Sequence, residues 1–377
     1  MENLRHDPIY RLLLDGPPRS VREIETLLGM SRVTASQRIR DLAQAGLIAE
    51  GESVASGGGR PARTWRIEPH HRNLVGIDVG ETMARVTLFS LGFEALDEEL
   101  LPIDLRAEPR GTLAALAAAA ERLVRSPAAS APVAALGIGL PAPIDYRQGR
   151  VARPSVMYGW EDLDIRALLS ERLGLPVALD NDVNLMCLAE QRLHWPEARN
   201  LVFIKAGTGI GCGIIADGHM LRGAFGTSGD IGHIQHTPQP HHLCRCGKEG
   251  CIEAHAAGWA IARDLRALGH ACEDARDVMR LYAAGAPECR ALVNAGSRII
   301  GTVGADLVAV LNPQMLVIGG TLSGAGEAML AGIRERIYQR CLPLATERLQ
   351  ICTAQGDGRL GAKGAAMLAW QRVTGPG

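Results

Sequence analysis

The chain has 377 residues, of which 47% are hydrophobic and 21% charged, and its formal net charge is −1. This length predicts two or three domains, and the composition is that of an ordinary soluble globular protein with enough apolar residues for a core. The near-zero net charge excludes a global field that attracts nucleic acid, so any such site must be local. We expect neither a membrane span nor a signal segment, because the sequence has no suitable apolar run.

The cysteines indicate the redox compartment. There are nine of them, and several, such as Cys187, Cys212 and Cys341, stand alone in apolar runs. This pattern favours a reducing compartment with one metal cluster over a framework of disulfides. We therefore predict a cytoplasmic protein.

The first seventy residues show the pattern of three short helices. The first is predicted at residues 8–14. The second begins after Ser20, which can form a capping box with Glu23, and it ends at Gly29. Only Gly29 and Met30 separate the second helix from the third, and such a short link is typical of a helix-turn-helix.

The third helix, which Ser31 opens, is predicted to recognise DNA. We expect Val33, Ile39 and Leu42 to face inward. The outward positions carry short polar groups and guanidinium groups, which suit base edges and phosphates. The predicted DNA contacts are Ser31, Arg32, Thr34, Ser36, Gln37 and Arg38, with Arg40 directed at the phosphate backbone.

A glycine-rich hairpin follows this helix and predicts the wing of a winged helix. Its strands are expected at residues 46–48 and 64–67, with a tip at residues 56–61. Arg60 at the tip suits the negative potential of a minor groove. Residues 31–66 hold six arginines and three acids, a local excess of +3 that fits DNA binding. The alternative is a three-helix interaction module with solvated arginines.

Residues 71–377 alternate between strands and helices. The order strand, turn, strand, strand, helix, strand over residues 74–140 predicts the opening of an actin-like, ribonuclease-H-like α/β domain. A second lobe is predicted from Asn200, with the same plan of a strand and a glycine turn, so we expect a cleft between two lobes. Its further predicted elements are strands at 201–205, 213–216, 315–318 and 349–353, and helices at 253–268, 275–284, 287–311 and 361–370.

The segment DNDVN, residues 180–184, offers the first candidate for chemistry. It follows a short strand and caps a helix that runs to His194. The carboxylate of Asp182, beside Asn181, can accept a proton from a sugar hydroxyl and activate it toward a γ-phosphate. The alternative is a plain helix cap, which is the role that we expect for Asp180.

Residues 207–253 combine a glycine-rich turn, an acid–histidine pair and a cysteine cluster. The turn can present N–H groups to an anion, and Asp230 with His233 can grip hydroxyl groups. Three thiolates and one histidine form a closed tetrahedral zinc site. The candidate ligands are Cys244, Cys246 and Cys251, with a fourth from His233, His236, His241 or His242. Four protein ligands leave no open position, so we predict one structural zinc ion per chain, which orders the loop carrying Asp230 and Glu253.

Several of these segments together resemble the signature of the ROK family, whose members are repressors, open reading frames and sugar kinases. They are GTGIGCGII (207–215), GTSGDIGH (226–233), CRCGKEGCIE (244–253) and LDNDVN (179–184). The resemblance covers essentially the whole chain. The N-terminal module makes the chain similar to the xylose-repressor and N-acetylglucosamine-repressor branch of the family.

The resemblance implies a role for each matching residue. Asn181 and Asp182 match a sugar-binding pair whose aspartate is the base in the kinases. Asp230 stands where the family usually has a glutamate that grips a sugar hydroxyl, and Glu253 matches another sugar ligand. His233 matches a histidine that binds zinc through one ring nitrogen and faces the sugar with the other. The kinases' phosphate loop corresponds to Gly207, Thr208, Gly209 and Gly211.

Two departures from the family pattern bear on function. The first phosphate loop of the kinases reads Asp-x-Gly-Gly-Thr-Lys, whereas residues 78–83 read DVGETM. Glu81 thus replaces a glycine and Met83 a lysine, and a carboxylate at this place repels the phosphates of ATP. The second departure is Asp230, which is one methylene shorter than the usual glutamate.

These observations predict a sugar-responsive, DNA-binding transcription regulator of carbohydrate metabolism genes, acting as a repressor. A winged helix at residues 1–70 would bind operator DNA, and residues 71–377 would bind a sugar or sugar derivative, in a homodimer or homotetramer. One alternative is an ATP-dependent sugar kinase with an appended DNA module, in which Asp182 is the catalytic base. Another is a dimerisation scaffold that binds no sugar.

Overall fold

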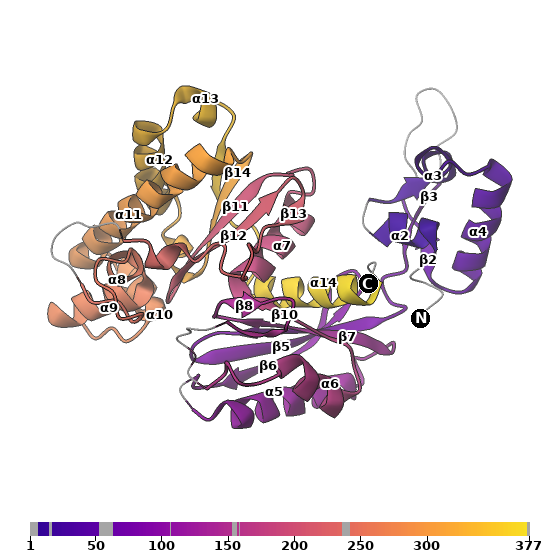
Figure 1. The fold of residues 1–377 in the computed structure, drawn as a ribbon, viewed down its shortest axis with the longest axis horizontal. Coiled ribbons are helices and arrows are strands. Elements are labelled where there is room, and N and C mark those ends of the chain that lie inside the picture. The colour runs from indigo at the N-terminus through magenta and orange to yellow at the C-terminus, as the bar shows by residue number, and fades with distance from the viewer. Residues whose placement is uncertain are drawn as a thin grey trace.

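The computed structural model describes residues 7–14, 17–52, 63–105, 107–152, 157, 159–235 and 242–374. An N-terminal group of helices lies at one end, and two α/β lobes follow it (Figure 1). The predicted hairpin tip with Arg60, and the candidate ligands His236 and His241, lie outside the described residues. Within the described residues, no helix is both long and apolar enough to cross a membrane.

Within the described residues, the N-terminal group has three helices and a small sheet. The capping box is confirmed: the Glu23 N–H donates to the Ser20 hydroxyl at 3.3 Å, and the Ser20 N–H donates to the Glu23 carboxylate at 2.7 Å. Gly29 ends the second helix with φ +62°, a left-handed conformation that glycine adopts readily. The elements are α2 (Pro8–Leu14), α3 (Val21–Leu28), α4 (Arg32–Gln44) and the sheet β1-β3-β2, formed by β1 (Arg19–Ser20), β3 (Thr64–Ile67) and β2 (Ile48–Glu50).

One prediction about α4 is wrong. Val33 does not face inward, because its side chain is 78% exposed. The buried residues of α4 are Ala35, Ile39 and Leu42, which are four and three positions apart and so share one face. Val33 lies two residues before Ala35, about 200° around the helix. The strand predicted at residues 46–48 starts only at Ile48, because Gly46 has φ +69°.

The first lobe is a five-stranded sheet in the order β10-β7-β4-β5-β6. Strands β10, β7 and β4 are parallel, and β5 and β6 are antiparallel additions. In Figure 1, α5 and α6 lie on one side of this sheet and α14 on the other. The elements are β4 (Asn73–Val79), β5 (Met83–Ser90), β6 (Ala95–Pro102), α5 (Pro109–Val124), β7 (Val133–Leu140), the short pair β8 (Ile144–Asp145) and β9 (Arg150–Val151), α6 (Ile165–Leu173), β10 (Val177–Asn181) and α14 (Leu360–Thr374).

The second lobe has a sheet in the order β13-β12-β11-β14-β15. Its strands are β11 (Leu201–Ala206), β12 (Ile210–Ala216), β13 (His219–Met220), β14 (Met315–Gly319) and β15 (Gln350–Thr353). Its helices are α8 (Glu253–Ala256), α9 (Gly258–Ala267), α10 (Ala275–Ala283), α11 (Pro287–Leu311), α12 (Glu327–Arg340) and α13 (Pro343–Thr346), with short 3₁₀ turns η1 (Ile231–His233) and η2 (Thr321–Ala325). The helix predicted at 253–268 is broken at Ala257, whose ψ of 157° is extended.

Two helices form the layer between the sheets. Helix α7 (Asp182–His194) contacts β11 and β12 of the second lobe, and α14 packs on α7 and on β7 and β4 of the first. The first turn of α14 passes Asp78 so closely that a Cβ on Gly361 would lie 2.5 Å from the carboxylate carbon, so only glycine fits there. Near its other end, Trp370 meets His71 edge to face at 6.4 Å.

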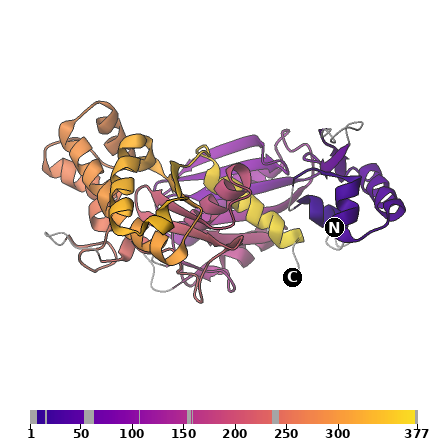
Figure 2. The same cartoon turned by 90° about the horizontal axis from the view of Figure 1, so that it is seen from above.

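The N-terminal group meets the lobes at this same end of α14. His71 also contacts Tyr10 of α2, with ring centroids 6.1 Å apart, and the Tyr10 hydroxyl lies 3.2 Å from Nε2 of His71. In Figure 2, α14 runs from the middle of the molecule toward the N-terminal group. One end of α14 therefore lies against Asp78, and the other contacts His71, which in turn contacts the N-terminal group.

Candidate functional site

Residues from both lobes converge where several strands end. Asp78 lies near the end of β4, Asp182 opens α7 directly after β10, and Lys205 lies near the end of β11. Glu253 begins α8. Because these residues stand at the carboxyl ends of strands or at the start of a helix, their polar side chains meet between the two lobes.

Asn181 rather than Asp180 caps α7. The Asn181 Oδ1 accepts hydrogen bonds from the N–H groups of Val183 and Asn184, at 2.9 Å and 3.3 Å. The prediction that Asp180 is a plain cap is wrong, because Asn181 occupies the cap position and the buried carboxylate of Asp180 accepts from Arg222 at 2.7 Å. The cap fixes the first turn of α7, on which Asp182 is buried.

Lys205 was not predicted as a site residue, but its ammonium forms an ion pair with Asp182. Burial alone would lower the pKa of Lys205, but the carboxylates of Asp182 and Asp78 outweigh it and raise that pKa. Burial raises the pKa of Asp78 to about 6, while Lys205 lowers it and Asp182 raises it further. A signal was available, because the sequence has three lysines and this one lies two residues before Gly207, near the end of an apolar strand.

A second cluster has the chemistry of a metal site. The ligand atoms of His233, Cys244, Cys246 and Cys251 all lie within 4.8 Å of one another. The Cys244 Sγ is 3.5 Å from Nδ1 of His233, and the Sγ atoms of Cys246 and Cys251 are 3.7 Å apart. Zinc–sulfur and zinc–nitrogen bonds of about 2.3 Å and 2.0 Å give ligand separations of about 3.5 Å to 3.8 Å in a tetrahedron, so these residues fit such an ion.

Of the predicted histidine candidates that are described, His233 is the one in this cluster. His242 instead packs against His255, with ring centroids 4.8 Å apart. While Nδ1 of His233 faces the thiols, its Nε2 lies 3.9 Å from the Asp230 carboxylate. One imidazole therefore contacts both the metal cluster and a predicted sugar ligand.

Glu253 joins the glycine turn to the metal loop. Its Oε2 accepts a hydrogen bond from the N–H of Ile210 at 3.1 Å, and its Oε1 accepts from Trp259 Nε1 and Arg245 Nη2, both at 3.3 Å. A Cβ on Gly209 would lie 2.8 Å from that Oε2. The predicted phosphate-loop residues, Gly207, Thr208, Gly209 and Gly211, lie at this turn between β11 and β12, so one turn amide is directed at a protein carboxylate.

The predicted DNA-contact residues lie on and around α4. Ser31 caps the helix through its hydroxyl, which accepts from the Thr34 N–H at 3.2 Å. Arg38 donates to the buried carboxylate of Asp7 at 2.6 Å, which holds it against α2. The exposed residues of the helix include Arg32, Val33, Thr34, Gln37 and Arg40, while Ser36 is half-buried.

Two α/β lobes with carboxylates gathered between them define an actin-like protein of the sugar-kinase type. Residues 74–372 match the ROK family, and the chain belongs to that family. It is 27% identical to a xylose repressor of Caldicellulosiruptor bescii over 88% of this chain and 86% of that protein. It is 30% identical to a glucokinase of Halalkalibacterium halodurans over 79% of this chain and 95% of that protein.

The crystal structure of a ROK family transcriptional regulator, a homolog of the Escherichia coli MLC protein, superposes with a TM-score of 0.81 at 26% identity. That likeness covers 99% of this chain and 96% of the regulator. It thus extends over the N-terminal group, whereas the match to the glucokinase leaves about a fifth of this chain uncovered.

Proposed function

We propose that this chain is a sugar-responsive, DNA-binding transcription regulator that acts as a repressor in the cytoplasm. The observation that carries the proposal is the likeness to a ROK family transcriptional regulator over 99% of the chain, including the N-terminal group. The xylose repressor also matches most of the chain. If residues 71–377 form a domain of the sugar-kinase type and the N-terminal group binds DNA, the chain should resemble both repressors and sugar kinases, as it does.

In this proposal, residues 1–70 form a winged helix-turn-helix, and α4 enters the major groove. Its exposed face carries Arg32, Thr34, Gln37 and Arg40, which suit phosphates and base edges. Val33 joins them, because an exposed apolar side chain on this face suits a thymine methyl group. Ser31 and Ser36 lie beside them, and Arg60 would contact the minor groove. Arg38 forms an ion pair with Asp7 and so serves partly to hold α4 against α2.

Residues 71–377 would bind a sugar or sugar derivative. Carboxylates, an amide and an imidazole can grip hydroxyl groups, and the proposed ligands are Asn181, Asp182, Asp230, His233 and Glu253. The three thiols and one imidazole of the metal cluster favour zinc over harder cations. With four protein ligands the zinc ion would be structural, and it would hold the loop that carries Asp230 and Glu253.

Sugar binding would close the two lobes and thereby change the spacing of paired N-terminal groups in a homodimer or homotetramer. Closure regulates DNA binding only if the two states of the protein differ in affinity for both the sugar and the operator. Helix α14 supports such coupling, because it touches Asp78 at one end and the contact between His71 and Tyr10 at the other.

The test is a footprint on the DNA upstream of the gene and of neighbouring carbohydrate genes, with and without D-xylose, D-glucose and N-acetyl-D-glucosamine. We expect one sugar to change operator affinity at least several-fold, and Glu253→Gln to abolish this response without abolishing DNA binding. If no sugar in a wider panel changes operator affinity, the proposed mechanism is wrong. If calorimetry also finds no sugar binding, the domain is a dimerisation scaffold.

The second candidate is an ATP-dependent sugar kinase with an appended DNA module. The glucokinase relative and the buried Asp182 favour it. Two contacts oppose it: Lys205 pairs with Asp182, and Arg245 pairs with Glu81 at the loop that would hold ATP phosphates. A coupled assay of ADP release, with Asp182→Asn as the control, tests this candidate. Sugar-dependent ADP release that Asp182→Asn abolishes would make the chain an enzyme.

A further inference from the structure

The turn between β4 and β5, residues 80–83, reaches from the first lobe to the second. It is a tight turn, in which the Gly80 N–H donates to the Met83 carbonyl at 2.9 Å. Its two central residues, Glu81 and Thr82, each meet an arginine of the second lobe, Arg245 and Arg276. Consecutive residues of one turn are thus held from the opposite side of the cleft.

Arg245 makes the stronger of these contacts. Its Nη1 donates to both Glu81 oxygens, at 3.1 Å and 2.9 Å, and its Nη2 donates to Glu253 Oε1 at 3.3 Å. Glu81 and Arg245 are each about one-third exposed, whereas the Glu253 side chain is 9% exposed. One guanidinium therefore bridges a carboxylate of the first lobe and a proposed sugar ligand of the second.

The position of Arg245 is fixed on several sides. In the sequence it stands between Cys244 and Cys246, two members of the metal cluster. Its guanidinium lies 5.1 Å from the ring centre of Trp259, whose Nε1 donates to the same Glu253 oxygen. A guanidinium held in this way can orient the Glu253 carboxylate and at the same time remain paired with Glu81.

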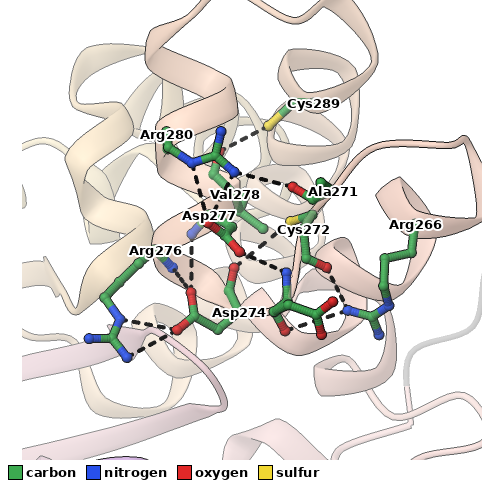
Figure 3. Close-up of polar contacts among 10 residues, drawn as sticks. Arg266, Ala271, Cys272, Asp274, Arg276, Asp277, Val278, Arg280 and Cys289 are labelled. Carbon is green, nitrogen blue, oxygen red and sulfur yellow. Dashed lines mark hydrogen bonds and ion pairs between the residues drawn. The ribbon is translucent and has the colours of Figure 1, made fainter.

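The neighbouring contact, between Arg276 and Thr82, also uses an arginine that other groups hold in place. Asp274 caps α10 by accepting from the Arg276 N–H at 2.8 Å, and its other carboxylate oxygen accepts from Arg276 Nε at 3.1 Å. Figure 3 shows the Arg276 guanidinium held beside Asp274 within a polar network at the start of α10. Its Nη2 then donates to the Thr82 hydroxyl at 3.2 Å.

We propose that Arg245 is a positioning residue for the sugar site: its pair with Glu81 holds the two lobes closed over the sugar, and its contact with Glu253 orients that carboxylate. This inference rests on the proposed sugar-binding function. Glu81 occupies the loop that binds phosphate in the family's kinases, so here the contact that closes the cleft comes from the chain's own side chains.

The expected effects follow from the exposure of the pair. Breaking a partly exposed ion pair weakens the closed state about two- to fivefold, and sugar affinity falls by the same factor because closure and binding are linked. Glu81 makes its contact with Arg245 rather than with the proposed sugar ligands. A change in sugar affinity in Glu81→Gln would therefore be transmitted through Arg245.

The experiment is calorimetry of the full-length wild type and variants with the sugar that binds from a panel of D-xylose, D-glucose and N-acetyl-D-glucosamine. We expect Glu81→Gln to raise the Kd about two- to fivefold. Arg245→Gln should raise it further, because it loses both carboxylates, and the double variant should match Arg245→Gln alone. The control is Glu99→Gln, which breaks a 2.7 Å ion pair with Arg122 inside the first lobe and should leave the Kd unchanged.

Metal analysis of each variant shows whether the loop is intact, and an unchanged zinc content in Glu81→Gln separates the lobe contact from damage to the metal site. If the wild type binds a sugar and Glu81→Gln binds it equally well, the inference is wrong while the proposed function stands. If the wild type binds no sugar in a wider panel either, the proposed function itself is contradicted. A Kd that changes equally in Glu99→Gln would also overturn the inference.

Discussion

At the scale of single residues, the pairing of Lys205 with Asp182 decides what the buried carboxylate can do. A general base must be free to accept a proton, and Asp182 is engaged by an ammonium whose pKa two carboxylates raise. The same ammonium lowers the electrostatic cost of holding Asp78 and Asp182 in one cleft. The pair therefore favours a binding site over a catalytic one.

This pair gives the first prediction. Lys205→Met leaves Asp182 buried without its cation, and we expect a loss of about 2–4 kcal/mol in the free energy of unfolding, measured by urea titration. The double variant Lys205→Met with Asp182→Asn should be more stable than Lys205→Met alone, because the uncompensated charge is gone. If Lys205→Met unfolds at the same urea concentration as the wild type, the pair contributes nothing to stability.

Sequence reasoning found the residues that carry a local signal and missed those that do not. The capping box at Ser20 and the cysteine spacing were predicted because their partners are a few positions apart. Lys205 is 23 positions from Asp182, and Arg245 is 164 positions from Glu81, so no local pattern connects either pair. Only the fold brings these charges together.

At the scale of elements, the loop between β12 and α8 depends on its proposed metal. It carries Asp230, His233 and Arg245, and it ends at Glu253. The four ligand atoms come from the 3₁₀ turn η1 and from residues 244–251, which lie outside the helices and strands, so a bound ion would tie these two stretches together. Ordering of this loop is therefore expected to be coupled to metal binding.

The second prediction concerns removal of this metal. We expect purified protein to contain about one zinc ion per chain, measured by mass spectrometry. Dialysis against a chelator, or Cys246→Ser, should weaken sugar binding by on the order of tenfold, because Asp230 and Glu253 lose their fixed positions. Cys341→Ser is the matched control, since Cys341 lies far from the cluster in the sequence and donates to the Ala305 carbonyl. Full sugar affinity without metal would contradict the proposed role of the ion.

The third prediction is a pH dependence at the contact between α2 and the lobes. Burial lowers the pKa of His71 below its usual 6.5, so the unfolded chain binds this proton more readily than the folded one. The stability that neutral His71 contributes is therefore present above about pH 6.5 and is lost as the pH falls through the folded pKa. His71→Phe should lose less stability than the wild type between pH 7.5 and 5.5, as measured by urea unfolding. An identical loss in both proteins would show that His71 stays unprotonated or contributes nothing.

Prediction at this scale succeeded for strongly patterned elements and failed where tertiary contacts decide. The strands of both sheets apart from the two-residue β13, and the long helix at 287–311, were expected, because their apolar runs are bounded by glycine and proline. Helices α6, α12 and α13 were missed. The inward face of α4 was misjudged at Val33, because the buried face carries Ala35, Ile39 and Leu42, and Val33 lies about 200° around the helix from Ala35.

At the scale of the whole molecule, α14 joins the proposed sugar site to the proposed DNA-binding group. Its start is pressed against Asp78, and Trp370 near its end is 4% exposed and touches His71. A packed helix is stiff, so a shift at one end is expected to be felt at the other.

The fourth prediction tests this connection. Trp370→Leu should leave the sugar Kd within about twofold of the wild type, since Trp370 is remote from the cleft end of the helix, but should reduce the effect of sugar on operator affinity. Gel-shift titrations with and without the bound sugar measure the effect. If the sugar response is unchanged although calorimetry and folding are normal, α14 does not couple the two sites.

The fifth prediction concerns assembly. Val310 at the end of α11 and Leu342 and Leu344 around α13 are 81%, 77% and 86% exposed, and an exposed apolar group of this kind marks an interaction surface. We expect Leu344→Asp with Leu342→Asp to lower the mass of the oligomer in light scattering. Leu268→Asp, at a 59% exposed leucine after α9, is the control and should leave the mass unchanged. An unaltered mass in the double variant would place the subunit contact elsewhere.

The turn at residues 80–83 has a consequence for the cell. In a protein whose lobes close on ATP, the response to sugar varies with the supply of ATP and with the ADP that competes for its place. Here Glu81 and Arg245 make the closing contact from the chain's own charges. The sugar concentration at which such a regulator responds would therefore be the same in starved and in well-fed cells, whatever their supply of ATP.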